Sequence, residues 1–137
     1  MKTDGRWVEI WDATQEIVLA DRAEVASSFW KLLVGVIPYR RLSPGQGMVL
    51  PSTGSIHTWG VRFPVDVLFL DRENKVLGRR AQVRPFRVAI APRGCHTAIE
   101  LPAGAIGSVD VGDHIMVRPC AAPGRALVGS GAQKPTE

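Results

Sequence analysis

The stretch S-I-H-T-W-G-V-R-F-P-V-D-V-L-F-L-D, residues 55–71, places several polar side chains directly before and within the start of an apolar strand. These polar residues are His57, Thr58, Arg62 and Asp66, and the rigid Pro64 lies among them. In a strand with a period of two, Asp66 shares a face with Leu68 and Leu70, which carries its carboxylate toward apolar surroundings. The stretch therefore predicts a central strand with either a ligand site or a polar structural joint at its start.

The chain before this strand predicts a hairpin followed by one helix. Residues 7–11 alternate, residues 12–15 supply a turn, and residues 16–20 are again rich in strand-forming residues. Asp21 has the type of a helix N-cap, with Glu24 in capping-box position. An apolar stripe with helical spacing follows, made of Val25, Phe29, Leu32, Leu33 and Val36. These signals predict an amphipathic helix from about Arg22 to Val34 that packs its stripe on a sheet.

The chain after residue 71 predicts further short strands separated by turns, over about residues 75–83, 86–91, 96–101 and 114–117. The segment Pro102-Ala103-Gly104 predicts a short helical turn near the C-terminal end. The resulting fold class is α+β: a compact, mainly antiparallel, curved sheet of partial-barrel form with one main amphipathic helix.

Composition predicts one globular domain over residues 1–118 and a disordered tail over residues 119–137, where Ala, Gly, Pro and Ser dominate. Of the 137 residues, 45% are hydrophobic and 22% charged, which is typical of a soluble globular protein. No apolar run approaches the roughly 20 residues of a membrane helix, and no signal peptide is recognisable at the start. We therefore expect a cytoplasmic protein without a membrane partner. Its two cysteines, Cys95 and Cys120, are expected to be reduced, although the sequence leaves a disulfide open.

The net charge of +4 is concentrated between Arg72 and Arg93, a span with seven basic residues and one acid, Glu73. Such an excess of positive charge can attract phosphate-rich partners. Only Phe86 interleaves with the arginines, whereas single-strand binders offer several stacking aromatic side chains. Strand alternation would also spread Arg79, Arg80, Arg84 and Arg87 over both faces. We therefore expect no specific binding of nucleic acid.

The sequence contains no G-x-S-x-G elbow, P-loop, H-E-x-x-H or dinucleotide-binding motif. The three histidines are far apart and lack the spacing of zinc ligands. No catalytic residue, metal site or cofactor is therefore predicted. Asp66 is the strongest candidate for a site residue, with a structural role as its alternative, in which the carboxylate accepts hydrogen bonds from loop N–H groups or Arg62. A hairpin with a loop over residues 60–63 would place His57 directly opposite Asp66, and Glu100 is expected to point outward into solvent.

Four segments together resemble a known family. They are L-S-P-G-Q-G-M (42–48), H-T-W-G-V-R-F-P-V-D-V-L-F-L-D (57–71), A-I-E-L-P-A-G (98–104) and V-G-D (111–113). In this order they closely resemble the uncharacterised family of domain of unknown function 192, DUF192, over about Ala20 to Val117. One departure is Val61, where related sequences commonly carry methionine. The resemblance implies a compact, β-rich α+β domain without an established activity, and a shared fold supplies no reaction.

Three functions follow as hypotheses. The leading one is non-catalytic binding of a small ligand or partner at a polar site formed by His57, Thr58, Arg62 and Asp66. The second is an enzyme that uses Asp66 and His57 as an acid–base pair, which requires both groups within about 3 Å of a substrate or bridging water. The third is binding of an anionic partner through the basic span from Arg72 to Arg93. The sequence leaves open the ligand, the partner, the presence of catalysis and the oligomeric state.

Overall fold

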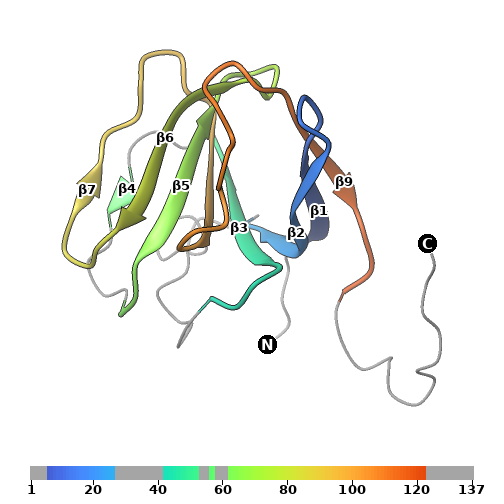
Figure 1. The fold of residues 1–137 in the computed structure, drawn as a ribbon, viewed down its shortest axis with the longest axis horizontal. Helices are drawn as coiled ribbons and strands as arrows, with labels where there is room; N and C mark the ends of the chain where they lie inside the picture. Colours follow the sequence, from blue (N-terminus) through green and yellow to red (C-terminus); the bar gives the residue numbers. More distant parts are fainter. Residues whose placement is uncertain (1–5, 27–41, 53–55, 58–61, 123–137) are drawn as a thin grey trace.

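The computed structural model describes residues 6–26, 42–52, 56–57 and 62–122, and this part of the chain consists of strands joined by turns (Figure 1). The strands are β1 (Arg6–Asp12), β2 (Ile17–Val25), β3 (Gln46–Pro51), β4 (Ile56–His57), β5 (Val65–Leu70), β6 (Val76–Val83), β7 (Val88–Ala89), β8 (Thr97–Pro102) and β9 (Ile115–Pro119). The predicted opening hairpin is confirmed, since β1 and β2 pair in antiparallel orientation.

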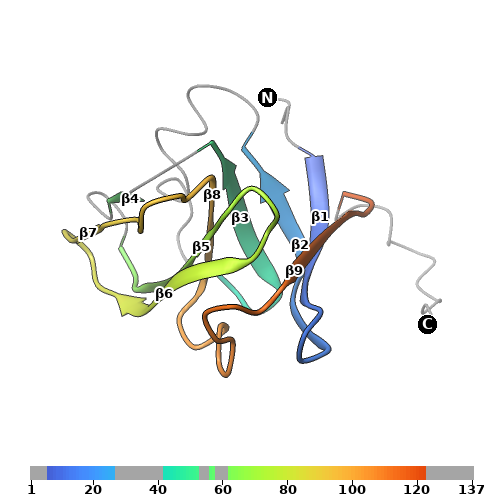
Figure 2. The same ribbon diagram turned by 90° about the horizontal axis from the view of Figure 1, so that it is seen from above.

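Seven strands form one curled sheet in the order β6-β5-β8-β3-β2-β1-β9, and β4 and β7 form a separate two-stranded sheet (Figure 2). The pairs are antiparallel except for β2 and β3, which run parallel. The two edges of the large sheet approach each other at one point. There the Val76 N–H donates to the Asp113 carbonyl at 2.9 Å and the Ile115 N–H donates to the Asn74 carbonyl at 2.9 Å. The sheet is therefore a half-barrel, and the predicted curvature is confirmed.

Both faces of this sheet are covered by apolar side chains. The concave face holds a core that includes Ile10, Leu68, Leu70, Ile99 and Ile115. The convex face holds a second core that includes Met48, Leu50, Val67, Phe69 and Ala98. Every residue of β5 and β8 is buried as a result. Such strands read as nearly continuous apolar runs because neither face meets water.

The predicted α+β class is wrong for the described residues, which contain no helix. The segment expected to begin the helix, Arg22 to Val25, belongs to β2. The N–H groups of Asp21 and Arg22 both donate to the Gly45 carbonyl at 3.0 Å, so Asp21 does not cap a helix. Pairing with β1 and β3 thus overrides the local capping signal. Residues 27–34, the rest of the expected helix, lie outside the described residues.

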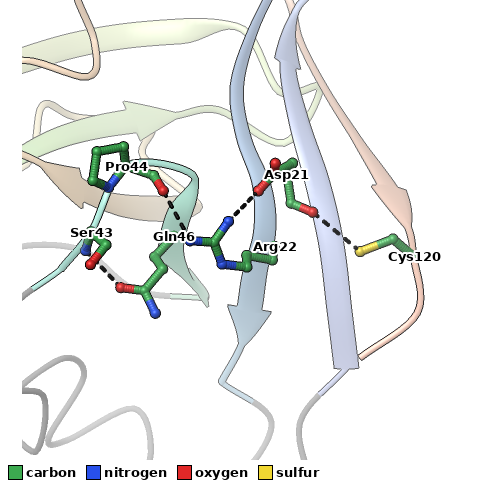
Figure 3. A network of polar contacts seen from close by, with 6 residues as sticks. All are labelled: Asp21, Arg22, Ser43, Pro44, Gln46 and Cys120. Atoms are coloured by element: carbon green, nitrogen blue, oxygen red, sulfur yellow. Dashed lines mark hydrogen bonds and ion pairs between the residues drawn. The ribbon is translucent and has the colours of Figure 1, made fainter. Parts of the chain in front are cut away.

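Side chains strengthen the junction between β2 and the loop before β3 (Figure 3). The Arg22 guanidinium donates to Asp21 Oδ1 at 2.9 Å and to the Pro44 carbonyl at 3.1 Å. Within the loop, the Ser43 N–H donates to Gln46 Oε1 at 2.6 Å. These contacts fix the loop beside β2 at the point where Arg22 and Gln46 start the parallel pairing.

The predicted helical turn near the C-terminal end is also wrong. Residues 103–108 form successive tight turns, in which Ala105 N–H bonds the Pro102 carbonyl and Gly107 N–H bonds the Gly104 carbonyl. Gly104 and Gly107 have φ values of +93° and +44°, which a right-handed helix does not allow. At the end of β9, Cys120 N–H donates to the Trp7 carbonyl at 2.9 Å. The rest of the expected tail, residues 123–137, lies outside the described part.

Candidate functional site

Asp66 is fully buried in β5, and its carboxylate is held by three backbone N–H groups. Oδ1 accepts from Gln82 at 2.8 Å, and Oδ2 accepts from Gly104 at 2.8 Å and from Ile106 at 3.0 Å. The carboxylate therefore joins the end of β6 to the turns that follow β8. This is the structural alternative foreseen for Asp66, with loop N–H groups rather than Arg62 as donors.

The predicted pairing of His57 with Asp66 is wrong. His57 lies in β4 and pairs with Val88 of β7, whereas Asp66 pairs with Leu101 of β8. The two residues thus enter different sheets, because the true strand partners of both come from later parts of the chain. Arg62 is exposed. Thr58 and the side chain of His57 lie outside the described residues.

A basic hollow of about 270 Å³ lies between the end of β6 and β7, and we call it the β6–β7 hollow. Its lining includes Arg80, Gln82, Arg84, Arg87 and Val88. The three arginines are exposed, and none of the described residues that line the hollow is acidic. The wall is therefore positively charged, and it faces solvent as a concave surface that favours anions.

The hollow is linked to two residues of the polar stretch, His57 and Asp66. Gln82 in its wall is the residue whose N–H bonds the Asp66 carboxylate, and Val88 is the strand partner of His57. Gln82 and Phe86 have positive φ values of +54° and +63°, which interrupt the regular alternation of side chains. Of the four arginines expected to spread over both strand faces, Arg80, Arg84 and Arg87 line the hollow. The fourth, Arg79, donates instead to the Gly107 carbonyl at 2.9 Å.

Two buried acids on the convex face escaped the sequence reasoning. Glu24 and Glu100 are only 3% and 4% exposed, and both are in register with Met48 of the strand between them. The sequence predicts a capping-box position for Glu24 and a solvated position for Glu100, and both predictions are wrong. The signal that could have revealed them is the continuous apolar character of the neighbouring strands, which indicates a sheet covered on both faces.

A second polar cluster lies at the opposite edge of the half-barrel, where the turn after β1 meets the segment before β9. Asp12 is fully buried, and its Oδ1 accepts from the N–H groups of Thr14 and Gln15 at 2.9 and 3.0 Å. Asp113 Oδ2 accepts from Gln15 Nε2 at 2.7 Å and from the Asp110 N–H at 3.0 Å. The two carboxyl groups are also hydrogen-bonded to each other, which requires one shared proton.

The pKa values of the two carboxyl groups shift in opposite directions, which favours the proton on Asp12. Burial raises the pKa of the Asp12 carboxyl above its ordinary value, and the hydrogen bond with Asp113 adds to this rise. The same hydrogen bond lowers the pKa of Asp113. No N–H or O–H donor from the described residues reaches Asp12 Oδ2, so this oxygen lacks the hydrogen bonds that stabilise a buried carboxylate. The pair therefore links the two segments most strongly when it carries one proton.

We expect the wild-type protein to lose stability as pH rises above 3.8, and we expect the Asp12→Asn variant not to show this loss. A raised folded pKa makes the stabilising contribution of Asp12 disappear from the ordinary value of 3.8 upward, as two carboxylates come to face each other. Asparagine keeps the Oδ1 acceptor and places an N–H donor toward Asp113 at every pH. Both proteins should still lose stability at low pH, where Asp113, whose pKa is lowered, becomes protonated.

Urea unfolding across the pH range measures this difference. Asp12→Ala serves as the comparison, since it removes both the acceptor and the donor; it should cost about 1–3 kcal/mol at acidic pH, where Asp12 carries its proton, and less as pH rises. Parallel stability–pH curves for wild type and Asp12→Asn would contradict the shared proton.

Burial raises the pKa of both cysteine thiols, Cys95 and Cys120, and neither forms a disulfide. A raised pKa lowers the thiolate fraction, so neither residue has the character of an activated nucleophile. Within residues 6–26, 42–52, 56–57 and 62–122, no three His, Cys, Asp or Glu side chains are grouped as metal ligands. The same residues include no helix with the length and apolar character needed to cross a membrane.

Comparison with known proteins identifies a family and a fold. The model of DUF192, described as "Uncharacterized ACR", matches residues 10–117. A protein of unknown function from Novosphingobium aromaticivorans DSM 12444 is structurally similar, with a TM-score of 0.69, 18% identity and coverage of 82% of this chain and 84% of that one. A proposed transcription regulator from Sinorhizobium meliloti 1021 has a TM-score of 0.71 and 18% identity, with 85% of this chain and 96% of that one covered. No curated protein matches the sequence. At this identity the similar structures establish the fold alone.

Proposed function

The chain belongs to the uncharacterised DUF192 family, and from its geometry we propose that it binds a small anionic ligand, without catalysis, in the β6–β7 hollow. The observation that carries the proposal is the convergence of Arg80, Arg84 and Arg87 on one hollow. Arginine presents a planar fork of donors that matches the oxygens of carboxylates and phosphates. A ligand with more than one negative charge suits three such groups.

The proposal joins two of the hypotheses raised by the sequence. The hollow is joined to two residues of the polar stretch, since its lining residues Val88 and Gln82 pair with His57 and bond Asp66. It also lies within the basic span from Arg72 to Arg93. In this interpretation Asp66 is a positioning residue, because it holds the Gln82 backbone that forms part of the wall. His57, Thr58 and Arg62 come from the neighbouring stretch and are proposed as further contributors to the site.

The acid–base alternative is less well supported by the geometry. A general base must come within about 3 Å of the proton that it removes. Both oxygens of Asp66 already accept backbone hydrogen bonds, and the residue has no exposed surface. Non-catalytic binding needs only the exposed guanidinium groups of the hollow.

We expect citrate and pyrophosphate to bind the wild-type protein, and the double variant Arg80→Gln/Arg84→Gln to weaken this binding about tenfold or more. The reason is that each charge-assisted hydrogen bond contributes about 1.5–3 kcal/mol and 1.4 kcal/mol corresponds to tenfold in affinity. Isothermal titration at low and physiological salt measures the affinity. Separate titrations of citrate, pyrophosphate and acetate distinguish carboxylate from phosphate ligands and multivalent from monovalent ones.

The matched control is Arg72→Gln/Arg93→Gln, which removes the same charge from two exposed arginines outside the hollow. It should change the affinity less than about twofold, since exposed charges that do not contact a ligand are largely screened by salt. If both double variants weaken anion binding equally, the effect comes from general surface charge, and the hollow is not the binding site. Absence of binding by both multivalent anions would overturn the proposed function itself.

A further inference from the structure

We propose a second binding site, independent of the β6–β7 hollow, in a cavity at the mouth of the half-barrel, and we infer that its ligand is a small amphiphilic carboxylate. The cavity has a volume of about 280 Å³. It lies at the end of the barrel where β1 and β8 begin and where β2, β3 and β9 end. Mouths of β-barrels are a preferred position for small-ligand sites.

The cavity exists because the half-barrel is not closed along its whole length. The two sheet edges meet through Asn74 and Ile115, and beyond this point β9 continues along β1 to Pro119 without pairing with β6. Asn74, Val117 and Pro119 therefore stand around an open seam. Their side chains are short, so they do not fill the space between the sheet edges.

The inner wall of the cavity is apolar. It is formed by Val8, Val25, Val49 and Val117, which come from four different strands. The first three are 4–5% exposed, and a ligand in the cavity would cover this residual apolar surface. Burial of apolar area contributes about 25 cal/mol per Å², so the gain favours a hydrocarbon body.

The polar part of the wall decides the head group. Arg6 lines the cavity from the exposed start of β1, while Thr97 and Asn74 supply neutral hydrogen-bonding groups. None of the described residues that line the cavity is acidic, and Arg6 makes no ion pair with a described residue. A carboxylate head beside Arg6, with its hydrocarbon chain among the valines, matches this distribution of charge. The small volume favours a short chain.

The test uses the full chain with valine methyl groups labelled for NMR and octanoate as the probe. Octanoate should shift the methyl signals of Val8, Val25, Val49 and Val117 in a saturable manner and show intermolecular NOEs to them. Arg6→Gln should weaken octanoate about tenfold while leaving the binding of octanol nearly unchanged, because only the carboxylate uses the charge. Arg93→Gln, an exposed arginine outside the cavity, is the matched control and should leave both ligands unaffected.

Val117→Phe fills the cavity from the half-buried side of β9 and should abolish the response to octanoate. If this variant does not fold, the wild-type NOEs still decide the location of the ligand. The proposal is overturned if octanoate up to its solubility limit leaves the four valine signals unchanged. It is equally overturned if Arg6→Gln weakens octanoate and octanol alike, or if the valine signals depend on protein concentration alone, which would mean that a second copy of the chain occupies the mouth.

Discussion

Replacing Asp66 by alanine is expected to lower the free energy of unfolding by about 3–6 kcal/mol, because three backbone N–H donors lose their acceptor together. The residue has no exposed surface, so water does not readily replace the carboxylate. Asp66→Asn should rescue only part of the loss, since its amide nitrogen would face one of the donors. Denaturant unfolding measures the effect, and a shift of the midpoint at constant m-value would identify a loss of native stability.

The matched control is Asp110→Ala. Asp110 is exposed, and its backbone N–H, which bonds Asp113, is retained in the variant. Its substitution should change stability by no more than about 0.5 kcal/mol. A loss below about 1 kcal/mol for Asp66→Ala would mean that the carboxylate does not hold the β6 end and the turns after β8 together.

Phe69→Ala is expected to cost about 3–5 kcal/mol through formation of a cavity and loss of the largest fully buried side chain among the described residues. Phe69 is 1% exposed in the convex core, and its direct partners on the adjacent strands are Gly78 and Ala98. These small partners leave room for the ring but cannot fill the space after its removal. Thermal or denaturant unfolding measures the loss.

Phe86→Ala is the natural comparison, because it removes the same side chain from a position that is 61% exposed. It should cost less than about 1 kcal/mol, as expected for an exposed residue. Similar losses for the two phenylalanines would show that the convex core is not packed as described.

The curved, mainly antiparallel sheet could be predicted from the sequence because alternation and turn residues act locally. The hairpin of β1 and β2 and the central strand β5 follow from such signals. The parallel pairing of β2 with β3 could not be predicted, since it depends on hydrogen bonds between Asp21 or Arg22 and the distant Gly45. A capping pattern in a short window cannot reveal such a partner.

The candidate site was predictable in part for a similar reason. The alternation of side chains along the strand correctly predicts that Asp66 points into the interior. A structural role, in which backbone N–H groups bind its carboxylate, is among the roles that the sequence predicts. Its donors Gly104 and Ile106 are about 40 residues away, so the sequence could not name them. The hollow lined by the arginines includes left-handed backbone at Gln82, and Phe86 nearby has the same conformation. A sequence does not reveal this conformation at glutamine or phenylalanine.

Because β1 lies between β2 and β9, its two edges can pair only at different times during synthesis of the chain. The first strand pairs on one side with the next strand along the chain, but on the other side with residues 115–119. At a synthesis rate of about 5–20 residues per second, this second partner follows after about 5–20 s. Until then the nascent chain carries β1 with one bare edge, and the concave core lacks Ile115. Completion of the half-barrel is therefore a late event of synthesis, and any folding before it takes place with an open strand edge.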